Sequence, residues 1–118
     1  MVGDYDRLHM VRRDAVLGGL LVAWGLRTGI AVEGPLDASG MNPRWIARVR
    51  TEHFEADLMI IYGPVIDVSA ARPYAVGLGY LVGGEADVSD ARFLEILDDL
   101  LAAGEGGPDP AWLRLVPN

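Results

Sequence analysis

Three side chains with metal-binding chemistry alternate along one stretch of the chain, namely His53, Glu55 and Asp57. Alternate residues of a β-strand project from the same face, and an imidazole with two carboxylates is a workable ligand set for a divalent metal. The first and last of the three would lie about 13 Å apart along a strand, which is too far to share one ion. The arginines expected opposite them, Arg48 and Arg50, would also repel a cation. We therefore expect an ion-paired, solvated face here and predict no metal site.

A glycine-rich segment, Gly77-Leu-Gly-Tyr-Leu-Val-Gly83, is superficially similar to a dinucleotide-binding loop. Its spacing differs by one residue, no helix is expected at its end, and no parallel β-α-β unit surrounds it. We instead expect Gly77 and Gly79 to form a shallow trough in which Gly18 and Gly19 of the first helix rest. The sequence predicts no bound cofactor.

Catalytic groupings are equally sparse. Neither histidine, His9 or His53, accompanies a serine in a recognisable nucleophile motif. Asp67, flanked by Ile66 and Val68, is the best candidate for a buried carboxylate with a raised pKa. Its expected position is the outer face of a strand, where it would be partly exposed. We predict no catalytic residue, and the sequence favours a non-enzymatic protein without deciding the question.

Composition sets the broad class of the protein. A chain of 118 residues is one domain by size, and 51% apolar with 23% charged residues is ordinary for a globular fold. The absence of cysteine excludes disulfides and thiolate metal sites. Since nothing points to an oxidising compartment, we expect a cytoplasmic protein.

Negative charge is concentrated in the C-terminal part of the chain. The net charge is −7, and all ten basic residues are arginine. Residues 1–72 hold nine acids and eight arginines, whereas residues 73–118 hold eight acids and two arginines. Such a field repels a phosphate backbone, so nucleic acid is not an expected partner, and it attracts a basic protein surface. Net charge also keeps a small protein soluble, and that simpler role remains open.

The N-terminal residues predict a helix that is capped by Asp4 or Asp6 and runs to about Leu26. The uncharged run 15–26 has the length of a signal-peptide apolar region and is too short to span a bilayer. The surrounding acids and the lack of a small-x-small cleavage site favour a buried helix. Because its apolar residues surround the helix axis, we expect it to lie deep in the structure. A membrane partner is not predicted, and a targeting role in some context stays open.

The segment from Trp45 to Val82 predicts an antiparallel meander, and residues 30–33 could add an edge strand before the loop 34–43. A two-residue turn at Thr51-Glu52 would place Val49 opposite Phe54.

The next turn, at Tyr62-Gly63-Pro64, would place Ile60 opposite Ile66 and Leu58 opposite Val68. The following strand is expected from Tyr74 to Val82 and is ended by Gly83-Gly84.

A second helix follows, capped by Asp87 or Ser89 and stopped by Gly104, with an apolar stripe on one side and acids on the other. Residues 104–110 form a Gly/Pro-rich link to an apolar C-terminal segment. The predicted fold is therefore α+β: an antiparallel meander of four or five strands, with an N-terminal and a C-terminal helix packed on one face.

The order helix, strands, helix in a small acidic chain resembles bacterial secretion chaperones and related peptide-binding modules, and equally the acidic immunity proteins that neutralise secreted toxins. The resemblance covers element order and charge. The chaperones usually place a helix between the third and fourth strands, and Ala70 to Tyr74 is too short to hold one. No functional residue is carried over from these families.

The sequence favours a non-enzymatic module that binds another, possibly basic, protein, as an immunity-type inhibitor or a chaperone-like peptide binder. Tryptophan and arginine are enriched at binding hot spots, and acids suit a basic partner. The predicted binding residues are Trp45, Arg48, Arg50, Glu95, Asp98, Asp99 and Trp112. One alternative is a small-molecule-binding domain or small enzyme with a pocket between helices and sheet, lined by Trp24, Tyr62 and Tyr80. Another is a structural subunit of a homo-oligomer, and a homodimer is possible.

Overall fold

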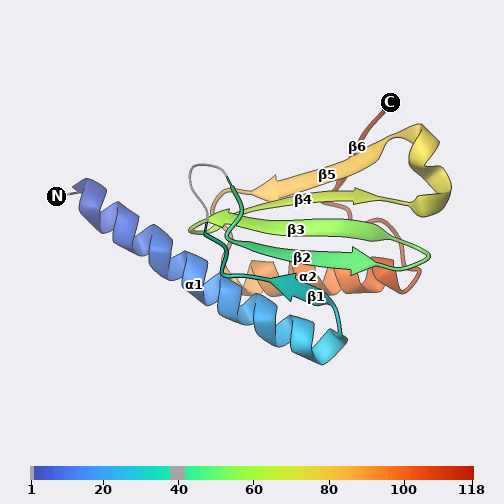
Figure 1. The fold of residues 1–118 in the computed structure, drawn as a ribbon. Helices are drawn as coiled ribbons and strands as arrows, with labels where there is room; N and C mark the ends of the chain where they lie inside the picture. The colour runs from blue at the N-terminus through green and yellow to red at the C-terminus, as the bar shows by residue number, and fades with distance from the viewer. Residues whose placement is uncertain (1, 38–41) are drawn as a thin grey trace.

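Six strands form an antiparallel meander in which each strand pairs with the next one along the chain (Figure 1). The computed structural model describes residues 2–37 and 42–118, and it describes no side chain for residues 2–12 or for Val76. The elements are α1 Val2–Thr28, β1 Ala31–Glu33, β2 Trp45–Arg50, β3 Glu55–Tyr62, β4 Val65–Ala71, the 3-10 helix η1 Pro73–Leu78, β5 Tyr80–Glu85, α2 Asp90–Gly104 and β6 Arg114–Val116. The predicted α+β class is therefore confirmed.

The predicted strand count of four or five is wrong, because β6 adds a sixth strand at the edge of β5, with Tyr80 opposite Val116. The strand predicted from Tyr74 is also wrong in its first half, where the chain forms η1. Gly79 then has a φ of +127°, a conformation that suits glycine, and β5 runs on through Glu85. The local pattern of residues 74–82 alone favours a longer strand. The positive φ of Gly79 and the pairing of β5 with β6 explain why the strand begins only at Tyr80.

The first predicted register is shifted by two residues. Four residues, 51–54, connect β2 to β3, so Val49 lies opposite Ala56 and not opposite Phe54. The hydroxyl of Thr51 accepts hydrogen bonds from the backbone N–H of His53 and of Phe54, each at 3.1 Å, and this stabilises the longer turn. Because a shift of two residues preserves the side-chain alternation, the same residues still face the core.

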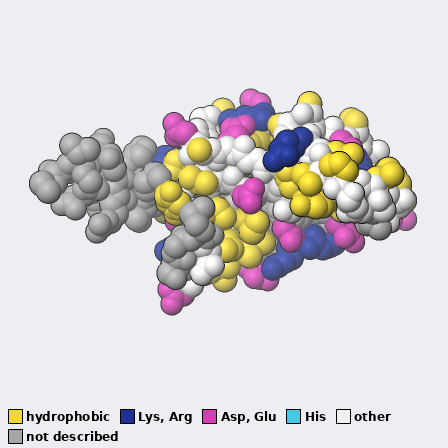
Figure 2. Space-filling model, turned by 90° about the horizontal axis from the view of Figure 1, so that it is seen from above, with side chains coloured by type: hydrophobic (Ala, Val, Ile, Leu, Met, Phe, Trp, Pro, Cys, Tyr) yellow, Lys and Arg dark blue, Asp and Glu magenta, His cyan; other side chains and the backbone are white. Residues whose placement is uncertain are grey.

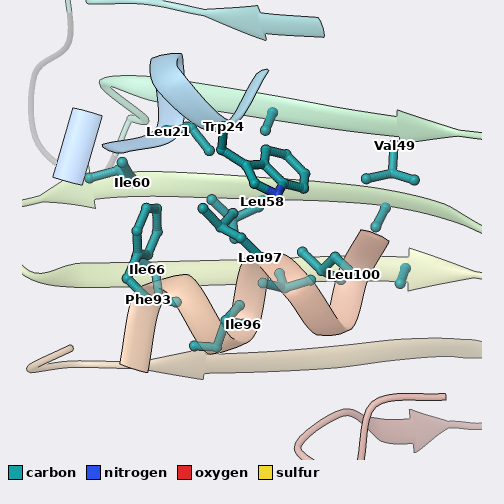
Figure 3. Close-up of a cluster of buried hydrophobic side chains, with 14 of the residues drawn as sticks. Leu21, Trp24, Val49, Leu58, Ile60, Ile66, Phe93, Ile96, Leu97 and Leu100 are labelled. Atoms are coloured by element: carbon teal, nitrogen blue, oxygen red, sulfur yellow. The ribbon is translucent and has the colours of Figure 1, made fainter. Parts of the chain in front are cut away.

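The second predicted register is confirmed, with Ile60 opposite Ile66 and Leu58 opposite Val68. The hydrophobic core lies between the inner face of the sheet and the two helices (Figure 3). Leu17, Leu21 and Trp24 of α1 and Phe93, Ile96, Leu97 and Leu100 of α2 contribute to it, each at most 1% exposed.

The helix α1 is only half covered, so the expectation that it lies deep in the structure is wrong. It also begins before Asp4 and Asp6, which contradicts the predicted cap, and the side chains of these two residues lie outside the description. Leu17 and Leu21 point into the core, while Val16 and Leu26 on the opposite side are 44% and 83% exposed. The run of apolar residues thus predicted a helix correctly but not its burial, because the sheet and α2 cover one side of it alone.

The predicted glycine trough is absent from the described residues. A side chain at Gly18 would overlap the indole of Trp45, whereas one at Gly77 would meet nothing within 4 Å. The backbone of Val116 in β6 lies closest to Gly79. Gly18 therefore makes room for an aromatic side chain of β2. Across residues 2–37 and 42–118, no helix combines the length and the apolar character needed to cross a membrane.

Candidate functional site

The outward side of α2 carries three of the predicted binding residues. The hydroxyl of Ser89, the N-cap, accepts a hydrogen bond from the backbone N–H of Arg92 at 3.1 Å and fixes the start of the helix. Because the apolar stripe of α2 faces the core, Glu95, Asp98 and Asp99 project to solvent and are exposed. The local sequence alone therefore places these carboxylates on one surface.

Trp112 lies beside one of these carboxylates, although it is distant from all three in sequence. Its indole Nε1 donates a hydrogen bond to Oδ2 of Asp99 at 2.8 Å. A Cβ at Gly83 would lie only 2.9 Å from the indole, so this glycine of β5 provides the space that the ring occupies. The indole is half-buried and remains accessible at the edge of the helix. We call Glu95, Asp98, Asp99 and Trp112 the acidic surface.

One arginine partly balances the charge of the acidic surface. The guanidinium of Arg92 pairs with Oε1 of Glu85 at 2.6 Å and with Oε2 of Glu95 at 3.3 Å. The hydrogen bond with Glu85, followed by attraction to both carboxylates against some desolvation, raises the pKa of Arg92 above its ordinary value. Among the described residues, Asp98 and Asp99 have no cationic partner. The surface therefore keeps an excess of negative charge.

The other three predicted residues lie elsewhere, so the structure does not bring the seven together. Trp45 packs against the core beside Gly18. Arg48 pairs with Glu33, and Arg50 pairs with Asp57 at 2.8 Å. On the face shown in Figure 2, charged side chains of both signs lie among hydrophobic ones. Arg48 and Arg50 are thus occupied by partners within the chain.

The one acid among the buried polar residues of the described chain is Asp14 of α1, which is 7% exposed. Its Oδ1 has no hydrogen-bond partner among the described residues, and its Oδ2 lies 3.7 Å from Nε of Arg44. Burial raises the pKa of Asp14, and the charge of Arg44 opposes this effect. Asp67, the carboxylate that the sequence favoured, is exposed on the outer strand face, as expected from its position in the strand.

A spacing signal could have identified Asp14. It continues the inward-facing series of Leu17, Leu21 and Trp24 by three residues in the N-terminal direction, which is the helical period. Among the described residues only Arg44 pairs with this carboxyl, whereas an acid–base pair needs two titratable groups of different pKa.

The metal triplet does not assemble, since His53 lies 3.3 Å from Glu52 while Asp57 pairs with Arg50. No group of three metal-ligating side chains occurs among the residues that the structure describes. The proposed pocket of Trp24, Tyr62 and Tyr80 does not form either, because Trp24 is buried and both tyrosines are exposed.

A different cleft, of about 500 Å³, opens between the C-terminal ends of both helices and the end of β2. Its lining is mainly apolar, including Ile30, Val49 and Leu101, with Arg48, Arg50 and Glu105 at its margin. It lies where β1 begins, so that Val49 and Arg50 at the end of β2 pair with β3 but have no partner in β1. The sequence did not predict this cleft.

No protein-family model, curated protein or solved structure matches the chain.

Proposed function

We propose that the protein is a non-enzymatic module that binds a basic protein partner through the acidic surface of α2. The observation that carries the proposal is the hydrogen bond from Trp112 to Asp99, which holds an aromatic ring at one of the three exposed carboxylates of α2. Tryptophan supplies large contact area at binding hot spots, while the carboxylates attract positive charge. An immunity-type inhibitor and a chaperone-like peptide binder would both use such a surface.

The charge balance supports a basic partner over a neutral one. Bringing a lysine or arginine side chain to Asp98 or Asp99 would provide the opposite charge that the chain itself does not. Since these carboxylates are exposed, each pair would contribute little by itself and would be weakened by salt. The proposal therefore predicts binding that depends strongly on ionic strength.

The test is capture from an extract of the native host on the immobilised chain, at about 50 mM and about 500 mM salt. We expect a basic protein to be retained at low salt and released at high salt. The double variant Asp98→Asn, Asp99→Asn should lose it. The control Glu55→Gln, Asp67→Asn removes the same charge from exposed positions on the outer sheet face and should retain it. Recovery of no protein at either salt, or equal loss in both double variants, would count against the proposal.

A small-molecule-binding domain is a second candidate, favoured by the cleft between the helix ends. Its volume of about 500 Å³ and its apolar lining are within the range of small-ligand sites. Thermal unfolding in the presence of a fragment library would test this role. Stabilisation by a fragment that disappears in Ile30→Trp, which fills the cleft, would support it. The absence of any stabilising fragment would argue against it.

A further inference from the structure

The outer face of α1 carries six exposed apolar residues. They are Ala15, Val16, Gly19, Val22, Ala23 and Leu26, all exposed. Leu26 is 83% exposed and Val16 44%, and a side chain at Gly19 would meet nothing within 4 Å. Figure 1 shows α1 at the margin of the molecule, with the sheet and α2 on one side of it. The residues span about 16 Å, or three helical turns.

A helix that is apolar all round is normally buried all round. The segment 15–26 contains no charged or hydrogen-bonding side chain other than the indole of Trp24, which points into the core. Half of this segment is therefore in water without a polar group to favour exposure. Such a contiguous apolar patch on a small protein is typical of an interaction surface.

The order of side-chain sizes along this face indicates the occupant. Along the central line of this face the small residues Ala15 and Gly19 come first and the larger Val22 and Leu26 follow. Val16 and Ala23 flank this line on one side. If a second copy packs antiparallel about a two-fold axis between Gly19 and Val22, each large side chain meets a small one. Leu26 then faces Ala15 of the second copy, and Val22 faces Gly19. The face is therefore self-complementary in shape, as a two-fold interface requires.

The charges at the two ends of the face fit the same arrangement. Arg27 is exposed beyond the C-terminal end and has no ion pair with the described residues. At the N-terminal end, Arg13 lines a shallow hollow together with Asp87 and Asp90, so the two acids outnumber the one arginine among the residues of that hollow. An antiparallel pair brings Arg27 of each copy toward the acidic end of the other, whereas a parallel pair brings like ends together.

The overall negative charge does not oppose this contact strongly. Residues 1–72 are nearly neutral at −1, and the excess acid lies in residues 73–118. The acidic surface of α2 is separate from the outer face of α1, so the two surfaces could be occupied independently.

We propose that the protein forms an antiparallel, two-fold homodimer through the outer face of α1. A contact over three helical turns is smaller than the roughly 800 Å² per partner of a standard stable interface. The dimer should therefore dissociate on dilution, with a dissociation constant on the order of 10 µM.

Sedimentation equilibrium between about 1 and 300 µM, a range that brackets this constant, tests association. The wild-type protein should pass from monomer to dimer. Val22→Glu should raise the dissociation constant at least about tenfold, because it places a charge in an apolar contact. Leu94→Glu on α2 is the matched control, since Leu94 and Val22 are each 37% exposed. Leu26→Glu, at a more exposed position, provides a second variant that keeps the fold. A wild-type monomer throughout, or equal loss in Leu94→Glu, would overturn the proposal.

Cross-linking tests the orientation, because the chain contains no cysteine. An antiparallel dimer places position 15 beside position 26 of the second copy, while the two positions 15 lie about 16 Å apart, too far for a disulfide. Ala15→Cys and Leu26→Cys should therefore cross-link when mixed and not when oxidised separately. Cross-linking of either variant with itself, or of neither combination, would overturn the antiparallel arrangement.

Discussion

The two helices pack on the same core, yet their outward sides differ in character. On α2, the buried Phe93 and Leu97 alternate with exposed Glu95, Asp98 and Asp99. On α1, the buried Leu17 and Leu21 alternate with exposed alanine, valine, glycine and leucine. The first pattern suits a helix whose outer side stays in water or meets a basic surface. The second suits a helix whose outer side is covered by apolar groups.

This difference shows that the inner face of a helix determines the fold, while its outer face carries information about partners. None of the residues on the outer face of α1 belongs to the buried core. The apolar residues there are therefore not explained by the folding of a single copy. The charged residues on α2 are compatible with solvent and gain a further role only if a basic partner binds.

The largest effect is expected at the anchor of the C-terminal end of α2. Arg72 is nearly buried, lies 4.8 Å over the ring of Phe54, and donates hydrogen bonds to the carbonyls of His53, Ala103 and Gly107. Arg72→Ala should lower the free energy of unfolding by about 3 kcal/mol, because it removes these hydrogen bonds and the ion pair with Asp109. Urea denaturation measures the change.

The control for Arg72→Ala is a second arginine without such contacts. Arg114 is exposed and has no ion pair with the described residues. Its replacement by alanine should change the free energy of unfolding by less than about 0.5 kcal/mol. Similar losses in both variants would mean that α2 does not depend on this anchor.

Substitutions at two neighbouring glycines distinguish the inner side of α1 from its outer side. Gly18→Ala should destabilise the protein by about 2 kcal/mol, because the new methyl group would overlap the indole of Trp45. Gly19→Ala should stabilise it by about 0.5–1 kcal/mol, since the methyl group enters open space and alanine favours the helix. Thermal unfolding at a concentration too low for association compares them. Changes of the same sign would contradict the assignment of the inner and outer sides.

The N-terminus of α2 allows a smaller test. Ser89→Ala should cost about 1 kcal/mol of unfolding free energy, because the backbone N–H of Arg92 loses its acceptor. Ser69→Ala, at an exposed position in β4, should have almost no effect. Denaturant unfolding measures the free energy of unfolding of both variants. An equal change in Ser89→Ala and Ser69→Ala would exclude a stabilising role for this cap.

The smallest effect concerns the buried acid of α1. Burial raises the pKa of Asp14 above its ordinary value of 3.8, so protonation of this carboxyl favours the folded state. The stability that the protonated carboxyl contributes is therefore fully present below pH 3.8. The contribution falls as the pH rises through the folded-state pKa. Asp14→Asn removes this dependence, so the stability of the variant relative to wild type should increase from pH 3 to pH 7. Asp67→Asn, at an exposed position, controls for the loss of a charge. A relative stability that is constant or falls with pH would contradict the burial of Asp14.

The sequence predicts the elements whose signals are local. The period of α2 and the alternation in β3 and β4 determine their faces and the pairing of Ile60 with Ile66. In contrast, β6 forms because the edge of β5 is available to it, and the turn at Thr51 depends on a side-chain hydrogen bond. Neither is visible in hydrophobic periodicity.

The candidate site was predictable to a similar extent. The three acids of α2 follow from the helical period, but the position of Trp112 depends on the turn that returns the chain across β5. The outer face of α1 is exposed because the sheet and α2 cover only the opposite side of this helix. These features arise from contacts between residues distant in sequence, which one chain read by itself does not specify.

The most direct test of the contrast between the two helices is an amide chemical-shift experiment that follows both outer faces. On dilution, signals of Val16, Gly19 and Val22 should shift while those of Glu95 and Asp98 stay constant. When polylysine is added to the dilute protein at low salt, the response should be reversed. Movement of both sets together, or of neither set, would contradict the account that α1 meets apolar groups and α2 meets positive charge.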